Sequence, residues 1–262
     1  MQNILKVARD AVPFAVNAYD SGSLTSDLAE VSSPFRDGEA HGYLTFNEGA
    51  LRVGIAGTDS IDSLLNDAVV SPRSLLDWSR FTGIPLAKDS LEVASSKGFL
   101  DHLYKTYSAL EYELDRLGIK DEDIHVAKFR GHSLGGAMGL LLPHTDKFKY
   151  AETVTFGAPK VYHHTTGFLP SRVRYQCWQY QDTVPYLPFG YKHAECQDVI
   201  LTLPNRVPFG ETPANLKPFI ATVVGGIWIS RAWRAAAKAC GSKSVQVFRA
   251  HSMARYSRLL GV

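Results

Sequence analysis

Ser133 lies in a sequence pattern that suits a nucleophilic serine. Residues 130–136 read Arg-Gly-His-Ser-Leu-Gly-Gly, between a β-prone stretch at residues 124–129 and an apolar, helix-compatible stretch at residues 137–142. A strand, a sharp turn and a helix in this order expose a serine hydroxyl, and the glycines remove side chains that would collide there. The alternative is an ordinary strand-to-helix turn with an incidental serine. The flanking elements favour a nucleophile, with the Leu134 N–H placed to hold a developing oxyanion.

A nucleophilic serine needs a histidine as its base, and chain order narrows the choice. Where the nucleophile follows a parallel strand, the order is Ser, then Asp or Glu, then His. Only His193 and His251 follow an acid placed downstream of Ser133, and position gives His251 only a modest edge. His132 adjoins the serine but cannot turn back to act as its base. The histidines that come too early, in polar segments where we expect solvated side chains, are His144, His163 and His164.

Asp182 is the acid that the strand pattern indicates. It follows residues 172–180, which are rich in aromatic and β-branched side chains and read as a strand. Functional groups gather beyond the carboxyl ends of parallel strands. Asp182 also fits a second description, as a turn-forming residue shortly before Pro185. Glu195 and Asp198 are rival acids, because they flank the next strand-like run.

At this point five ordered blocks of sequence resemble the class 3 lipase family, the α/β-hydrolase group that includes the fungal triacylglycerol lipases. The resemblance extends from about residue 41 to residue 260. Besides the Gly-His-Ser-Leu-Gly-Gly elbow, the blocks are Thr-Phe-Gly-Ala-Pro-Lys-Val at residues 155–161, Asp-Thr-Val-Pro-Tyr-Leu-Pro at residues 182–188, Tyr-Lys-His-Ala-Glu at residues 191–195 and His-Ser-Met-Ala-Arg-Tyr at residues 251–256.

The resemblance implies a role for each candidate. Ser133, Asp182 and His251 match the family's catalytic triad, and His193 matches a histidine outside it. Thr58 matches the second oxyanion position, beside Leu134. A turn residue that ends a hairpin strand is the alternative for Thr58. This chain departs from the family at residue 56, where alanine replaces the usual basic residue, so another group must brace this turn.

These residues predict a serine hydrolase that cleaves carboxylic ester bonds of lipids, with a triacylglycerol lipase favoured. His251 would take the proton of Ser133 as the serine attacks, an acyl-enzyme would form, and Asp182 would stabilise the imidazolium. A phospholipase or a short-chain carboxylesterase is the runner-up. A catalytically silent, lipid-binding α/β-hydrolase-fold protein belongs to a different class, but such a protein has no reason to keep the complete set. No cofactor is required.

Composition agrees with this function without deciding it. The 262 residues are 45% hydrophobic and 21% charged, which suits a single domain over residues 1–262. A net charge of +2 argues against a nucleic-acid partner. Three cysteines, an odd number, make a disulfide framework or a zinc site improbable. The N-terminus has no signal-peptide pattern, which leaves a cytoplasmic chain, a mature form or a non-classically secreted one.

The hydrophobic periodicity predicts an α/β chain with an α/β-hydrolase fold, in which a mostly parallel, doubly wound sheet carries helices on both faces. Residues 3–19 read as an amphipathic helix, and residues 41–46 and 51–55 as a hairpin. The clearest helix covers residues 99–117, and its apolar face indicates core packing.

Two long segments depart from the alternation of strands and helices. Residues 59–97 follow Thr58, the expected oxyanion residue, at the place where the family carries its lid. We therefore expect a possible lid here, and a fixed surface helix is the alternative. Residues 207–247 form an insertion whose apolar run is too short to span a bilayer and fits an interfacial helix, a pocket wall or a buried helix. We expect transient contact with a lipid interface and no transmembrane segment. The expected substrate-binding residues are Trp78, Phe81 and Trp228.

Overall fold

The computed structural model describes residues 2–19, 31–58, 71–163, 174–179, 182, 184–186, 188, 191–193, 197–201 and 251–262. Residues 59–70, the insertion at residues 207–247 with Trp228, and Glu195 lie outside the described residues.

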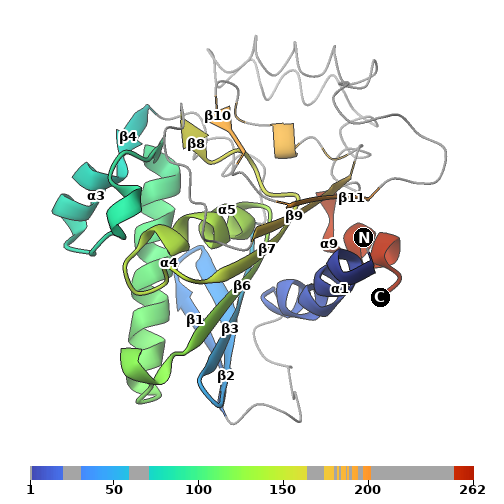
Figure 1. Cartoon of the computed structure of the whole chain (residues 1–262), viewed down its shortest axis with the longest axis horizontal. Coiled ribbons are helices and arrows are strands. Elements are labelled where there is room, and N and C mark those ends of the chain that lie inside the picture. Colours follow the sequence, from blue (N-terminus) through green and yellow to red (C-terminus); the bar gives the residue numbers. More distant parts are fainter. Residues whose placement is uncertain are drawn as a thin grey trace.

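A mostly parallel sheet organises these residues. Within the described ranges, seven strands form one sheet in the order β1-β2-β3-β6-β7-β9-β11 (Figure 1). The pairings of β2 with β1 and with β3 are antiparallel, and every pairing from β3 to β11 is parallel. The strands are β1 (Val31–Asp37), β2 (Ala40–Asn47), β3 (Ala50–Ile55), β6 (Val126–His132), β7 (Glu152–Phe156), β9 (Arg174–Gln179) and β11 (Gln197–Leu201).

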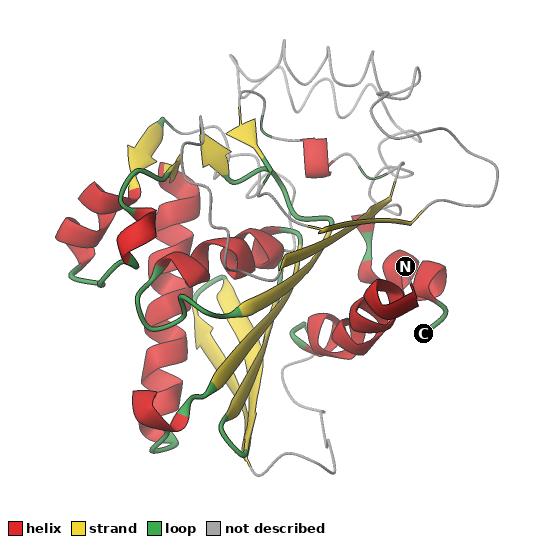
Figure 2. Cartoon of the chain, viewed as in Figure 1, coloured by secondary structure: helices red, strands yellow, loops and turns green. Residues whose placement is uncertain are grey.

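Helices cover both faces of the sheet (Figures 1 and 2). Helices α4 (Lys97–Arg116) and α5 (Leu134–Leu141) pack on one face, and α1 (Gln2–Asn17) and α9 (Met253–Leu260) pack on the other. Small elements complete the description: β4 (Pro72–Ser74), α3 (Leu75–Thr82), β5 (Ala94–Ser96), β8 (Tyr162–His163), β10 (Tyr191–Lys192) and the 3₁₀ turns η1 (Lys88–Ser90), η2 (Asp121–Asp123), η3 (Leu142–His144) and η4 (Val184–Tyr186).

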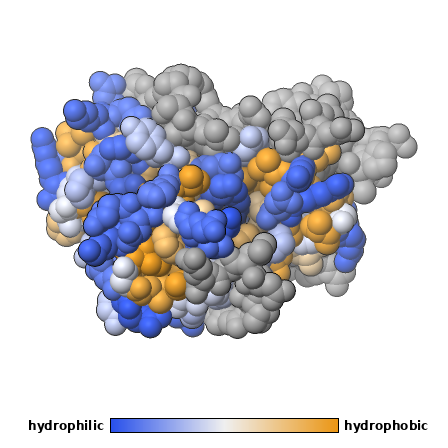
Figure 3. Space-filling model, turned by 60° about the horizontal axis from the view of Figure 1, so that its bottom comes forward, coloured by the Kyte–Doolittle hydropathy of each residue, from blue (hydrophilic) through white to orange (hydrophobic). Residues whose placement is uncertain are grey.

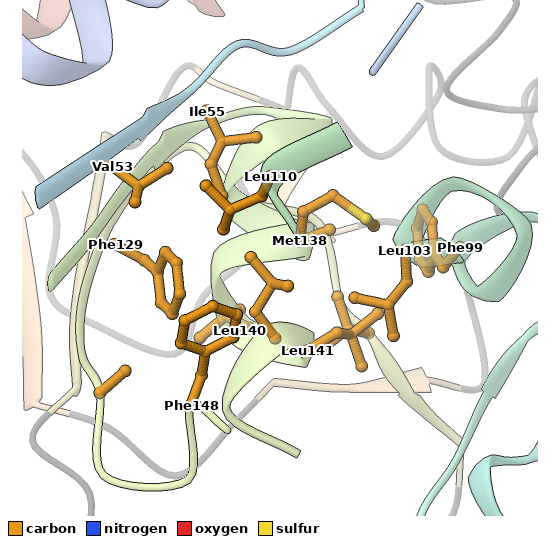
Figure 4. Close-up of a cluster of buried hydrophobic side chains, with 14 of the residues drawn as sticks. Val53, Ile55, Phe99, Leu103, Leu110, Phe129, Met138, Leu140, Leu141 and Phe148 are labelled. Atoms are coloured by element: carbon orange, nitrogen blue, oxygen red, sulfur yellow. The ribbon is translucent and has the colours of Figure 1, made fainter. Parts of the chain in front are cut away.

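Two hydrophobic clusters hold the three layers together. The larger one fills the space between the sheet and helices α4 and α5, and Figure 4 shows part of it, including Val53, Leu110 and Phe129. The smaller one joins the sheet to α1 and α9 through residues such as Phe156 and Tyr256. Both faces of the parallel strands are therefore buried, which is the usual condition for a parallel sheet.

A helix that spans a bilayer must be both long and apolar. Within the described part of the chain, none of the helices combines the length and the apolarity needed to cross a membrane. On the face shown in Figure 3, apolar side chains lie in several patches between hydrophilic ones.

Candidate active site

Ser133 occupies a strained turn between β6 and α5. Its backbone has φ 57° and ψ −126°, a conformation that non-glycine residues rarely adopt. The Ser133 N–H donates to the Phe156 carbonyl at 3.0 Å, which ties the turn to β7. A Cβ on Gly131 would lie 2.2 Å from the Gly135 carbonyl oxygen, and a Cβ on Gly135 would lie equally close to that of Ile55. The two glycines are therefore required for this turn, as the sequence pattern indicated.

Asp182 follows the carboxyl end of β9 and is completely buried. The Val184 N–H donates to its Oδ1 at 3.0 Å. Its Oδ2 accepts from the Tyr256 hydroxyl at 2.5 Å and from the His251 Nδ1 at 2.8 Å. One carboxylate oxygen therefore makes the local turn, and the other bonds to the histidine. Asp198, the rival acid, lies in β11.

His251 stands just before α9, with 8% of its surface exposed. Because Nδ1 donates to Asp182, the neutral imidazole carries its lone pair on Nε2. That nitrogen is buried, and no group of the described residues, the Ser133 hydroxyl included, hydrogen-bonds to it. The candidate acid and the candidate base are therefore brought together, and the nitrogen that a base would use is left available.

His132 and His193 are both engaged elsewhere. The His132 ring contacts the Tyr19 hydroxyl through Nδ1 and the His251 carbonyl through Nε2. The His193 ring contacts Gln176 through Nδ1 and the Pro185 carbonyl through Nε2. Burial lowers the pKa of His193 to about 4, and burial together with the neighbouring His251 lowers the pKa of His132 well below its usual range. Both rings are neutral at neutral pH and hold loops in place.

The turn after β3 lies directly against the elbow. A Cβ on Gly57 would come within 2.7 Å of the Ser133 Cβ and 2.8 Å of the His132 carbonyl oxygen. The Ala56 N–H donates to the His41 carbonyl at 3.0 Å, and the Gly57 N–H donates to the Tyr19 hydroxyl at 2.9 Å. These two bonds brace the turn that leads to Thr58, although residue 56 has no basic side chain.

Sequence reasoning missed the hydrogen-bonding side chains around the candidate residues, and it was wrong about His144. Tyr256 reaches Asp182, and Tyr19 reaches both the turn and the elbow. His144 is completely buried and contacts the hydroxyls of Ser90 and Tyr162 at 2.9 Å each, whereas a solvated ring was expected. The signal for Tyr256 was its place in the block at residues 251–256 that resembles the class 3 lipase family.

The expected substrate-binding residues differ in their surroundings. Trp78 is 7% exposed, and its indole N–H donates to the Leu100 carbonyl at 2.9 Å, so it docks α3 onto α4. Phe81, three residues later, is 91% exposed. The described part of the expected lid, residues 71–97, is thus packed on the core through its buried side chains.

Comparison with known proteins decides the family. The model of the family described as Lipase (class 3) matches residues 52–192, which is more than half of the chain. The chain belongs to the class 3 lipase family. It is therefore a lipase-type carboxylic ester hydrolase. No protein with curated annotation matches its sequence significantly.

Solved lipase structures share the fold of this class 3 lipase. Lip2 lipase from Yarrowia lipolytica superposes with a TM-score of 0.58 at 21% identity, covering 79% of this chain and 82% of that one. A triacylglycerol lipase from Penicillium expansum gives 0.55 at 15%, covering 76% and 80%. Rhizomucor miehei triacylglyceride lipase gives 0.53 at 17%, covering 77% and 81%. The predicted α/β-hydrolase fold, with its mostly parallel sheet, is thereby confirmed.

Proposed function

We propose that Ser133, His251 and Asp182 form the catalytic triad of a lipase that hydrolyses acylglycerol esters. The observation that carries this proposal is the buried hydrogen bond between Asp182 and His251, which leaves the His251 Nε2 with a lone pair and no partner among the described residues. A strained serine next to such an imidazole is the arrangement that activates a hydroxyl for acyl transfer.

The mechanism follows from these positions. The Ser133 Oγ attacks the ester carbonyl while its proton passes to the His251 Nε2, and Asp182 stabilises the resulting imidazolium. The imidazolium then protonates the leaving alcohol, which yields an acyl-enzyme. Water attacks the acyl-enzyme by the reverse sequence of proton transfers and releases the fatty acid. The tetrahedral oxyanion of each step is held by the backbone N–H groups of Thr58, at the end of the turn after β3, and of Leu134, the first residue of α5.

Burial favours an ester that arrives from an apolar phase. Ser133 is only 3% exposed, and sites that bind apolar ligands such as a long acyl chain are typically enclosed. We include transient contact with a lipid interface in the proposal, and Phe81 fits that contact better than Trp78 because its ring already faces outward. Residues 1–262 act as a single domain, and the net charge of +2 gives it no pronounced attraction for nucleic acid.

The triad is tested by single and combined substitutions. Ser133→Ala, His251→Ala and Asp182→Asn should each remove at least about three orders of magnitude of kcat on a p-nitrophenyl ester, and combining them should add little, because the three act as a unit. His193→Ala, the matched control, should keep substantial activity. An active His251→Ala with an inactive His193→Ala would show that the base is His193.

The substrate class is tested on emulsions. Wild type and Ser133→Ala are compared on emulsified triglyceride, on phospholipid vesicles and on soluble short-chain p-nitrophenyl esters. We expect the highest turnover on triglyceride. A preference for phospholipid would make the protein a phospholipase, and activity confined to soluble esters would make it an esterase. Hydrolysis that persists in Ser133→Ala would overturn the proposed nucleophile, and inactivity of the wild type on every ester would favour a lipid-binding role.

A further inference from the structure

Tyr19 and His132 form a bridge between the two halves of the site. The Tyr19 hydroxyl lies 2.9 Å from the Gly57 nitrogen and 2.6 Å from the His132 Nδ1. The other ring nitrogen of His132, Nε2, lies 2.5 Å from the His251 carbonyl oxygen. One pair of side chains therefore joins the turn before Thr58 to the backbone of His251, and the bridge passes through the residue next to Ser133.

The directions of these hydrogen bonds are fixed by the chemistry of their ends. A carbonyl oxygen only accepts, so the His132 Nε2 must carry the hydrogen. A neutral His132 then has a bare Nδ1, which accepts from the Tyr19 hydroxyl. The oxygen of that hydroxyl accepts from the Gly57 N–H. All three bonds thus run one way, from Gly57 through Tyr19 and His132 to His251, and each bond is consistent with the next.

Burial keeps this bridge in its neutral form. His132 is 6% exposed, and its ring stacks on that of His251 with centroids 4.6 Å apart and an interplanar angle of 32°. Burial and the adjacent His251 lower the pKa of His132. When His251 takes up a proton, a neutral neighbour at this distance is tolerated, whereas a second imidazolium would repel it.

We propose that Tyr19 and His132 are positioning residues, which fix the oxyanion turn and the catalytic histidine relative to Ser133 through one directed chain of hydrogen bonds. The proposal rests on the function proposed above. The bonded partners lie 38, 113 and 119 positions apart in the sequence, so neither local turn nor local helix geometry sets their relative positions. Catalysis tolerates little displacement of either group, since the oxyanion donors and the base act in the same transition state.

The test removes the hydrogen bonds of the bridge and keeps an aromatic ring at each of its two positions. Tyr19→Phe deletes one hydroxyl, and His132→Phe keeps a ring against His251 while it deletes both hydrogen bonds. Each should lower kcat on a soluble p-nitrophenyl ester by about ten- to a hundredfold with KM unchanged, since a small misplacement of reacting groups costs that much. Inactivation by a p-nitrophenyl phosphonate, whose tetrahedral oxyanion needs the same donors, should slow in parallel. The double variant should lose no more than the worse single variant, because both cut one chain.

Tyr162→Phe is the matched control. Tyr162 is also buried, and its hydroxyl also contacts a buried histidine, His144, at 2.9 Å, but this pair lies outside the proposed machinery. Its removal should lower thermal stability and leave kcat as it is. All rates are measured at a temperature at which circular dichroism shows each variant folded.

The outcomes separate this inference from the proposed function. An active Ser133→Ala overturns the proposed nucleophile, whatever the bridge does. An inactive Ser133→Ala combined with wild-type kcat in Tyr19→Phe and His132→Phe overturns the bridge alone. A kcat loss no larger than that of Tyr162→Phe, or a loss in the double variant equal to the product of the two single losses, also overturns it. If Tyr19→Phe does not fold, the comparison of His132→Phe with Tyr162→Phe decides the question.

Discussion

Tyr256 completes the environment of the Asp182 carboxylate. Its hydroxyl donates to Oδ2, the same oxygen that accepts from His251, and both residues come from the segment that forms α9. A Cβ on Gly157 would lie 2.5 Å from that oxygen and 2.9 Å from the Tyr256 hydroxyl, so the loop after β7 closes tightly over the pair. Asp182 is therefore oriented by three donors from two parts of the chain.

Tyr256→Phe should lower kcat about tenfold and leave KM unchanged. The variant keeps the ring packed against Phe156 but removes one of three donors to a buried carboxylate, and hydrogen bonds to charged groups contribute about 1.5–3 kcal/mol. Because Val184 and His251 still hold Asp182, the loss should stay well below that of Asp182→Asn. Steady-state kinetics measure kcat and KM, and urea unfolding shows whether the variant is folded. Tyr112→Phe, at a 70% exposed position, is the control, and an equal loss of activity there would contradict the argument.

Single residues were predictable where chemistry and chain order constrain them. Residue type and sequence order indicated Ser133 and Asp182 but gave His251 only a modest edge over His193, and the family resemblance selected the set. The structure brings Asp182 and His251 into contact. The partners of those residues were not predictable, because a tyrosine hydroxyl finds its acceptor only once helices are packed. The prediction of a solvated His144 was wrong for the same reason. Its polar neighbours in sequence suggested exposure to solvent, whereas the fold places Ser90 and Tyr162 around the ring.

Helix α3 presents an apolar side chain outward from a fixed base. Ser74 caps its first turn, with its Oγ accepting from the Leu76 and Asp77 N–H groups at 3.1 and 3.4 Å. Trp78 anchors its inner face to α4. Phe81 lies on the outer side, 91% exposed. A rigid helix that carries an exposed aromatic ring is suited to contact with an aggregate of lipid, since the ring loses little conformational freedom there.

Phe81→Ser should lower the hydrolysis of emulsified long-chain esters several-fold and leave that of soluble short-chain esters unchanged. The reason is that removing an exposed ring reduces the apolar area available to a lipid surface, at about 25 cal/mol per Å². Initial rates on both substrates provide the measurement. Tyr150→Ser is the matched control, because Tyr150 is 80% exposed and precedes the amino end of β7, whereas Ser133 follows the carboxyl end of β6. Equal losses on both substrates would indicate a folding defect, and no loss would remove Phe81 from the interface.

Elements with a clear periodicity were predictable, and an irregular edge strand was not. The hairpin of β2 and β3 and the long helix α4 lie within two residues of the expected bounds. Strand β1 was missed because Pro34 and polar neighbours make its sequence resemble a loop. Proline is tolerated there because β1 is an edge strand, paired only with β2 among the described strands. Strand β6 also runs on to His132, where the sequence suggested that the turn had begun.

At the scale of the whole molecule, sheet order assembles the candidate site. Strands β3, β6, β7 and β9 are parallel neighbours, so their carboxyl ends lie side by side at one end of the sheet. The turn with Thr58, then Ser133, Gly157 and Asp182 follow these strand ends in that order, and the segment before α9 adds His251. Functional groups gather beyond the carboxyl ends of the strands in such folds generally, so the sequence could predict this location. The contact of Tyr19, which follows α1, with these strand ends depends on packing and was not predictable.

Buried histidines make the stability of the whole fold depend on pH. Burial lowers the pKa of His102, with help from Lys105 and His41, and that of His193, from 6.5 to about 4 in both cases. Between these values the unfolded chain binds protons that the folded chain does not, so stability is complete above about pH 6.5 and declines as the pH falls toward 4. The pKa of the partly buried Glu111 is raised by desolvation, which acts in the opposite sense over the range in which that carboxyl titrates.

Urea unfolding at pH 7, 6, 5 and 4.5 should therefore show a steady loss of stability. A full shift from 6.5 to 4 corresponds to roughly 3 kcal/mol per histidine, an upper limit because the unfolded chain retains some structure. His102→Gln and His193→Gln remove the titrating rings, so each should flatten the slope of stability against pH, even where it lowers stability at pH 7. His102 lies in α4 and His193 follows β10, so their effects should add in the double variant. A wild-type stability that stays constant from pH 7 to 4.5, or an unchanged slope in both variants, would show that other groups carry the acid response.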